Sequence, residues 1–198
     1  FRFGACLADD MGLGKTVQLL SYLLAVKEKG DEKGPALIIC PTSVLGNWQK
    51  EIERFAPSLS VYLHYGPGRL KGEDFAKKVS QFDIVLSSYG LAHLDFDEFS
   101  SFTWSTIAID EAQNIKNPGT KQSRAVRKLK GLHHIALTGT PMENRLTELW
   151  SIFDFINHGY LGSLGQFQKR FVVPIEKDEK KGKIEELQNL IRPFLLRR

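Results

Sequence analysis

Residues 9–16 form a glycine-rich turn that ends in lysine and threonine, reading Asp-Asp-Met-Gly-Leu-Gly-Lys-Thr. Glycines let the backbone turn tightly against phosphate oxygens, and successive N–H groups at the start of a helix bind an anion. In such loops the lysine reaches the β- and γ-phosphates and the hydroxyl ligates Mg²⁺. We therefore predict that this segment binds Mg²⁺–ATP. The predicted nucleotide-binding residues are Asp10, Met11, Gly12, Leu13, Gly14, Lys15 and Thr16.

Asp9 stands where the usual GxxxxGK[ST] pattern has its first glycine. That departure leaves an alternative open, a glycine-rich turn that carries a Gly-Lys-Thr triplet by chance. The apolar run at 5–8 before the turn and the helical pattern after it favour the phosphate loop, because the motif requires a strand on one side and a helix on the other.

Two adjacent acids, Asp110 and Glu111, follow the apolar run Thr106–Ile109. Ligands of α/β sheets bind beyond the carboxyl ends of the strands, where the phosphate loop also begins. We predict that Asp110 holds Mg²⁺ together with Thr16, and that Glu111 is the base that orients and deprotonates water. With Lys15, these acids are the predicted catalytic residues. Alone, a pair of acids is also common on a solvated strand end.

Short apolar runs separated by helical patterns predict an α/β fold. The runs are continuous rather than alternating, which is typical of a parallel sheet covered on both faces. We expect a three-layer domain with a mostly parallel central sheet over residues 1–145 and a helical appendage over 146–198. Strands are predicted at 5–8, 36–40, 61–64, 84–86, 106–109 and 135–137, and helical stripes at 17–26, 45–55, 146–153 and 184–191.

Composition restricts the class of protein less than the motifs do. The net charge of +4 is a mild bias towards anionic partners. Two cysteines without a CxxC spacing predict a reduced intracellular setting, and no apolar run reaches the length of a membrane span. Trp48 falls on a helical stripe, so we expect it in the core. Because the chain opens almost directly on a strand and a motif, we expect it to be a piece of a longer protein.

Several segments, in order, resemble the motifs of Swi/Snf-type helicase-like ATPases of helicase superfamily two. Residues 9–16 are similar to motif I and residues 110–117, Asp-Glu-Ala-Gln-Asn-Ile-Lys-Asn, to the DEAH-like motif II. Residues 40–48 are similar to motif Ia, 86–89 to the strand-end motif that follows, 137–141 to motif III, and 193–198 to the segment leading out of the first lobe.

The resemblance implies a RecA-like (P-loop NTPase) lobe of a motor that hydrolyses ATP to move along double-stranded DNA and remodels protein–DNA complexes. It places Thr42, Ser43, Ser88 and Tyr89 near the DNA, and it gives Gln113, Thr138, Gly139 and Thr140 the role of coupling the nucleotide site to DNA. Residues 43–57 are most similar to bacterial or archaeal members, which implies a cytoplasmic, nucleoid-associated protein, or a nuclear one if eukaryotic.

The sequence departs from the full family pattern in three ways. It lacks the upstream glutamine segment that reads adenine, it lacks the second RecA-like lobe with its γ-phosphate arginine, and Gln113 replaces the commoner histidine. We therefore expect weak nucleotide and DNA binding and little turnover from this chain alone. Two other functions stay open, an RNA helicase lobe and a non-catalytic nucleotide-binding scaffold.

Overall fold

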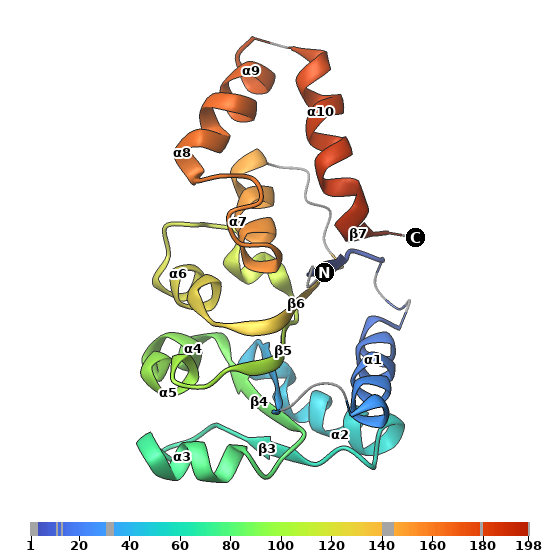
Figure 1. The fold of residues 1–198 in the computed structure, drawn as a ribbon, viewed down its shortest axis with the longest axis vertical. Helices are drawn as coiled ribbons and strands as arrows, with labels where there is room; N and C mark the ends of the chain where they lie inside the picture. Colours follow the sequence, from blue (N-terminus) through green and yellow to red (C-terminus); the bar gives the residue numbers. More distant parts are fainter. Residues whose placement is uncertain are drawn as a thin grey trace.

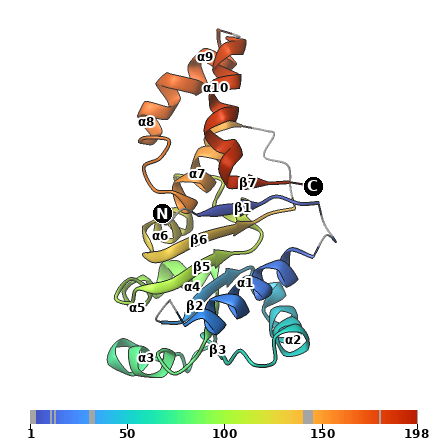
Figure 2. The same ribbon diagram turned by 45° about the vertical axis from the view of Figure 1, so that its right-hand side comes forward.

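A seven-stranded sheet in which every neighbouring pair of strands is parallel forms the centre of the computed structural model (Figures 1 and 2). The structure describes residues 4–10, 12, 14–30, 34–139, 145–178 and 180–197. The strand order is β3-β4-β2-β5-β6-β1-β7. The strands are β1 (Ala5–Leu7), β2 (Ala36–Cys40), β3 (Val61–Leu63), β4 (Ile84–Ser88), β5 (Trp104–Ile109), β6 (Gly131–Leu137) and β7 (Leu195–Leu196).

Helices cover both faces of this sheet and extend beyond one edge of it (Figure 2). They are α1 (Lys15–Lys29), α2 (Leu45–Phe55), α3 (Gly72–Val79), α4 (Tyr89–Leu94), α5 (Phe96–Ser100), α6 (Lys121–Lys128), α7 (Leu146–Ile156), α8 (Leu164–Phe167), α9 (Val173–Glu176) and α10 (Lys181–Ile191). Short 3₁₀ turns lie at Thr42–Val44, Ala112–Ile115 and Arg192–Phe194, and a π-helical turn at Gln168–Val172 joins α8 to α9.

The core is divided into two apolar layers by the sheet. Successive residues of a strand point to opposite faces, and β2 shows this directly. Ile38 packs with the buried side chains of α1 and α2, whereas Leu37 packs with those of α3 to α7. All five residues of β2 are buried, which explains their continuous apolar sequence. The prediction of a three-layer α/β domain is confirmed.

Several predicted elements differ from the observed ones at their ends. β6 begins at Gly131 rather than 135, because polar His133 and His134 lie within the strand and interrupt its apolar pattern. Phe55, placed on the buried stripe of α2, is instead 40% exposed, and the Arg54 guanidinium lies 4.9 Å from its ring centroid. Ile184 of α10 is 41% exposed, so that stripe is buried mainly at Leu187.

Residues after 145 are mainly helical, and they end in an additional strand. α7 packs on β6, and its buried side chains join the apolar layer that also contains Phe167, Phe171 and Leu187. The chain then returns to the sheet, where β7 pairs in parallel with β1. The segment is therefore attached to the lobe at both of its ends. No helix among the described residues is long and apolar enough to cross a membrane.

Candidate nucleotide site

The glycine-rich turn and the paired acids meet at one edge of the sheet. The turn leaves the carboxyl end of β1, and Asp110 follows the carboxyl end of β5. Only β6 separates these two strands, and all three are parallel. Lys15 is near enough for its charge to act on Asp110, where it favours the ionised carboxylate. The two predicted halves of the site are thus adjacent, although they are far apart in the sequence.

The turn has the backbone geometry that its glycines allow. Gly12 and Gly14 have φ angles of 86° and 75°, in the left-handed region, and nothing within 4 Å would meet a Cβ at either. The Lys15 ammonium donates hydrogen bonds to the carbonyl oxygens of Asp9 (2.8 Å) and Asp10 (3.2 Å). Its side chain is therefore folded back over the turn. Met11 and Leu13 lie outside the described residues.

Asp9 occupies the position of the motif's first glycine without needing a glycine's conformation. Its side chain is buried, and its carboxylate accepts a hydrogen bond of 3.4 Å from the Gln18 amide on α1. Among the described non-glycine residues only Glu111 has a positive φ, so the position of Asp9 does not require glycine. Aspartate is therefore compatible with the backbone conformation at this position.

The Asp110 carboxylate is held from two sides. Its Oδ2 accepts a 2.9 Å hydrogen bond from the Trp48 indole N–H, and its Oδ1 accepts one of 2.9 Å from the Glu111 backbone N–H. Burial raises the pKa of Asp110, and these two hydrogen bonds act against that rise. Trp48, predicted in the core from its helical stripe, is buried, with 2% exposed. Its contact with Asp110 could not be predicted, because nothing in a helical stripe indicates a partner 62 residues away.

Glu111 occupies a strained backbone position and begins a chain of side-chain contacts. Its φ and ψ are 51° and 56°, which a non-glycine residue rarely adopts. The Gln113 amide N–H donates to the Glu111 carboxylate at 2.5 Å, and the Thr138 hydroxyl donates to the Gln113 amide oxygen at 3.1 Å. The structure thus joins three predicted residues in one path between β5 and β6. Gly139 follows Thr138 and is half-buried, whereas Thr140 lies outside the described residues.

The four residues predicted near DNA divide into two pairs. Thr42 and Ser43 are exposed on the 3₁₀ turn after β2. Ser88 and Tyr89 are each 3% exposed, and their hydroxyls have partners inside the protein. The Ser88 side chain caps α4 by accepting from the Leu91 N–H at 3.5 Å. A direct side-chain contact of this second pair with DNA would require them to leave these positions.

Tyr89 instead reaches the backbone of the paired acids. Its hydroxyl donates to the Asp110 carbonyl at 2.5 Å and lies 3.4 Å from the Glu111 carbonyl. Burial raises the pKa of the Tyr89 phenol well above its ordinary value, so the hydroxyl keeps its proton at neutral pH. The side chain therefore supports the strained peptide at Glu111 from the first residue of α4.

The residues present fit a magnesium ion bound together with a nucleotide. The Asp110 carboxylate and the Thr16 hydroxyl are oxygen donors of the kind that Mg²⁺ prefers, and both residues are half-buried at the shared edge. In the part of the chain that the structure describes, no three His, Cys, Asp or Glu side chains gather into a metal cluster. Mg²⁺ usually binds few protein ligands and completes its shell with water and phosphate.

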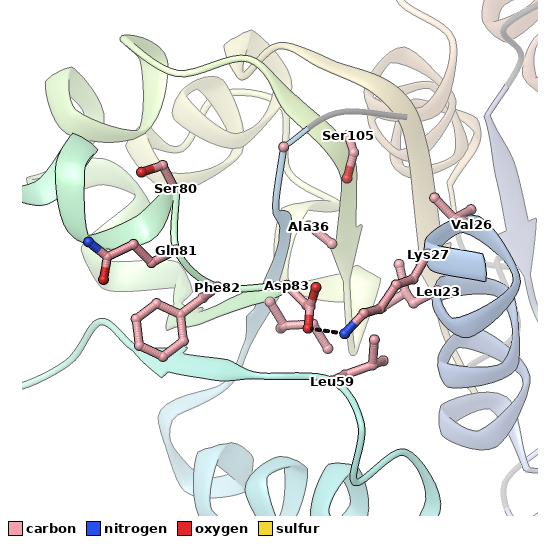
Figure 3. A pocket seen from close by; sticks show the side chains of 12 residues that line it. Leu23, Val26, Lys27, Ala36, Leu59, Ser80, Gln81, Phe82, Asp83 and Ser105 are labelled. Atoms are coloured by element: carbon pink, nitrogen blue, oxygen red, sulfur yellow. Dashed lines mark hydrogen bonds and ion pairs between the residues drawn. The ribbon is translucent and has the colours of Figure 1, made fainter. Parts of the chain in front are cut away.

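A separate hollow of about 270 Å³ lies at the opposite edge, by the amino ends of β2, β4 and β5 (Figure 3). Within it, Lys27 of α1 and Asp83 form an ion pair of 2.8 Å, drawn as the dashed line. Burial raises the pKa of Asp83, but hydrogen bonds from Lys27 and Ser60 outweigh burial and lower it overall. We assign no ligand there, because ligands of parallel sheets bind at the carboxyl edge.

A family model and curated relatives match this chain over nearly its whole length. The family model described as SNF2-related domain matches residues 2–198. YwqA of Bacillus subtilis, by name an ATP-dependent helicase/translocase, is 71% identical over 196 residues that cover 99% of this chain. The TATA-binding protein-associated factor mot1 of Schizosaccharomyces pombe is 36% identical over 220 residues covering 100% of this chain.

Two solved structures have the same fold as this chain. The Sulfolobus solfataricus SWI2/SNF2 ATPase core in complex with double-stranded DNA is 47% identical, with a TM-score of 0.87 over 99% of this chain. The same core described without DNA gives 45% identity and a TM-score of 0.86. The chain spans 21% of YwqA, 11% of mot1 and 40% of the core solved with DNA.

Proposed function

The chain belongs to the SNF2-related domain family, and on that premise we propose that it is the ATP-binding lobe of a motor that moves along double-stranded DNA and remodels protein–DNA complexes. The observation that carries the proposal is the meeting of the phosphate loop with Asp110 and Glu111 at one sheet edge. The relatives named as ATP-dependent helicases support nucleotide-driven activity. The core solved with double-stranded DNA supports duplex DNA as the track.

Each residue of the edge has a role in this proposal. Lys15 leaves the turn carbonyls and binds the β- and γ-phosphates, while the backbone N–H groups of the turn hold the remaining phosphate oxygens. Glu111 accepts a proton from the attacking water. Mg²⁺, held by Thr16 and Asp110, would neutralise the charge on the phosphate oxygens. Gln113, which contacts both Glu111 and Thr138, couples the nucleotide site to the end of β6.

The DNA contacts in this proposal are mainly to phosphates. Thr42 and Ser43 offer exposed hydroxyls and backbone N–H groups on the turn after β2, next to the nucleotide edge. Such groups position a duplex without reading its sequence. We therefore expect little sequence preference. DNA affinity measured by titration should fall steeply with salt, by roughly 0.9 log unit per tenfold salt for each phosphate contact. An affinity that stayed constant with salt would contradict this.

The chain alone supplies half of the catalytic groups. An arginine acting on the γ-phosphate can contribute roughly 10³–10⁵-fold to the rate of phosphoryl transfer. In the family this arginine belongs to a second lobe, which we propose as the partner of this one. We therefore expect this chain to bind ATP weakly and to hydrolyse it slowly. Rapid DNA-stimulated hydrolysis by the 198-residue chain would refute that expectation.

The decisive experiment measures ATP hydrolysis by the full-length protein with duplex DNA, with duplex RNA and without nucleic acid. We expect stimulation by DNA, and its loss in Glu111→Gln, which keeps the size of the side chain but cannot act as a base. Stimulation by RNA alone would favour an RNA helicase. A Glu111→Gln variant that kept every activity of the protein would favour a nucleotide-binding scaffold.

A further inference from the structure

We propose that Trp48 is a positioning residue that fixes the Asp110 carboxylate in the orientation in which it accepts Mg²⁺ with the nucleotide. The inference rests on the proposed function, because it takes Asp110 as a metal ligand. It adds a residue of α2 to a site built from the ends of β1, β5 and β6. Its indole N–H lies 2.9 Å from Oδ2 of Asp110.

The surroundings of Trp48 hold the indole in place. The side chain is 2% exposed, in the apolar layer that also contains Leu45, Ile52 and Leu86. An indole N–H is a donor only, and here it points out of this layer towards the edge of the sheet. The packing of α2 thus sets the position of the donor, and the donor sets the position of the carboxylate.

The two hydrogen bonds of Asp110 together define its side-chain orientation. Oδ1 is tied to the Glu111 N–H and Oδ2 to the indole, each at 2.9 Å. A carboxylate has about four lone-pair positions, so each oxygen keeps one free for a cation or its water. Without the indole, the Glu111 N–H would be the one remaining hydrogen-bond donor to the carboxylate among the residues that the structure describes. Outer partners of metal ligands typically contribute about 10–100-fold to metal affinity in this way.

Trp104 provides a matched control. It is also a fully buried tryptophan whose indole N–H is used, in this case donating to the Phe99 carbonyl at 2.9 Å. It lies at the start of β5, at the end of the strand away from Asp110. Trp104→Phe therefore removes the same chemical group and a similar packing volume as Trp48→Phe, without touching the nucleotide edge.

The test is ADP binding to this chain by calorimetry, with saturating MgCl₂ and with EDTA. In the wild type Mg²⁺ should tighten ADP binding. Trp48→Phe should reduce that tightening about tenfold while leaving the affinity in EDTA unchanged, and Trp104→Phe should preserve it within about twofold. If Trp48→Phe keeps the Mg²⁺ effect, or if both affinities fall in parallel, the inference is wrong while the proposed function stands. A wild type indifferent to Mg²⁺ would overturn both.

A second measurement leaves Trp48 in place, in case Trp48→Phe does not fold. The chain has three tryptophans, so its nitrogen–proton NMR spectrum has three indole signals, which Trp104→Phe and Trp150→Phe assign. Asp110→Asn replaces the charged acceptor by a neutral one of equal size. We expect the Trp48 signal to shift in Asp110→Asn and the other two to stay. An unmoved Trp48 signal would refute the contact and with it the inference.

Discussion

Removing the Tyr89 hydroxyl tests how the strained peptide at Glu111 is maintained. In Tyr89→Phe the ring stays in the core, where only 3% of the residue is exposed, and one oxygen is lost. That oxygen lies 2.5 Å from the Asp110 carbonyl and 3.4 Å from the Glu111 carbonyl. The variant therefore removes the support of the peptide and leaves the rest of the aromatic packing unchanged.

Two free energies decide the outcome. A left-handed conformation costs a non-glycine residue about 1–2 kcal/mol. A buried carbonyl that loses its donor costs about 1–3 kcal/mol. Because the two are of similar size, the peptide at Glu111 no longer has a clear preference for φ of 51° once the hydroxyl is absent. Turning the peptide would move the carboxylate away from the Gln113 amide, which now lies 2.5 Å from it.

The assay is steady-state ATP hydrolysis by the full-length protein at saturating duplex DNA. We expect kcat to fall about tenfold, equivalent to roughly 1.4 kcal/mol, with KM for ATP little changed, since the phosphate loop is untouched. Tyr160→Phe is the control, because it removes a hydroxyl that donates to the Leu190 carbonyl at 2.9 Å, in the helical segment. If Tyr89→Phe matched the kcat of the wild type, Tyr89 would not support Glu111.

Three further predictions concern stability. Burial raises the pKa of Asp95, but hydrogen bonds from Arg69, Lys71 and His64 lower it overall. The ionised carboxylate therefore stabilises the fold above about pH 4, and this contribution is lost as the pH falls below that. Urea titration should therefore show that Asp95→Asn lowers the free energy of unfolding by about 3 kcal/mol at neutral pH. The decrease of that free energy in acid should be weaker than in the wild type, and an unchanged decrease would contradict this. Burial lowers the pKa of His134 to about 4. The free energy of unfolding should therefore fall by up to about 3 kcal/mol as the pH drops from 6.5 to 4, because the unfolded chain binds the proton first. Urea titrations of His134→Gln should not show that loss. A Cβ on Gly4 would lie 2.2 Å from the Ile156 carbonyl oxygen, so Gly4→Ala should lower the melting temperature by roughly 6–12 °C, whereas Gly46→Ala, which meets nothing within 4 Å, should not lower it.

Most of the sheet could be predicted from the sequence because its strands are buried on both faces. The continuous apolar runs at β2 and β5 need no partner to be recognised, and parallel strands bring their carboxyl ends to one edge. The presence of the glycine-rich turn and Asp110 at one sheet edge follows from that rule alone. β7 was missed, since two leucines beside an arginine carry no periodic signal. Its pairing depends on the position to which α10 returns the chain.

The supporting contacts of the site could not be predicted in the same way. Trp48 and Tyr89 belong to a helical stripe and a strand end, and their burial is what a core residue would also show. Their contacts with Asp110 depend on the spacing of α2, β4 and β5 across the sheet. The placement of Ser88 and Tyr89 near DNA stays a prediction, and both side chains are buried in this structure.

The double attachment of the helical segment has a mechanical consequence. α7 rests on β6, and β7 is bonded to β1 through parallel backbone pairs, with a further 2.8 Å bond from the Ala8 N–H to the Leu196 carbonyl. Ala8 immediately precedes the glycine-rich turn. The two strands to which this segment is attached, β6 and β1, are neighbours in the sheet, and β1 leads into the glycine-rich turn. A movement of α8, α9 or α10 relative to the sheet would therefore act on both strands next to that turn.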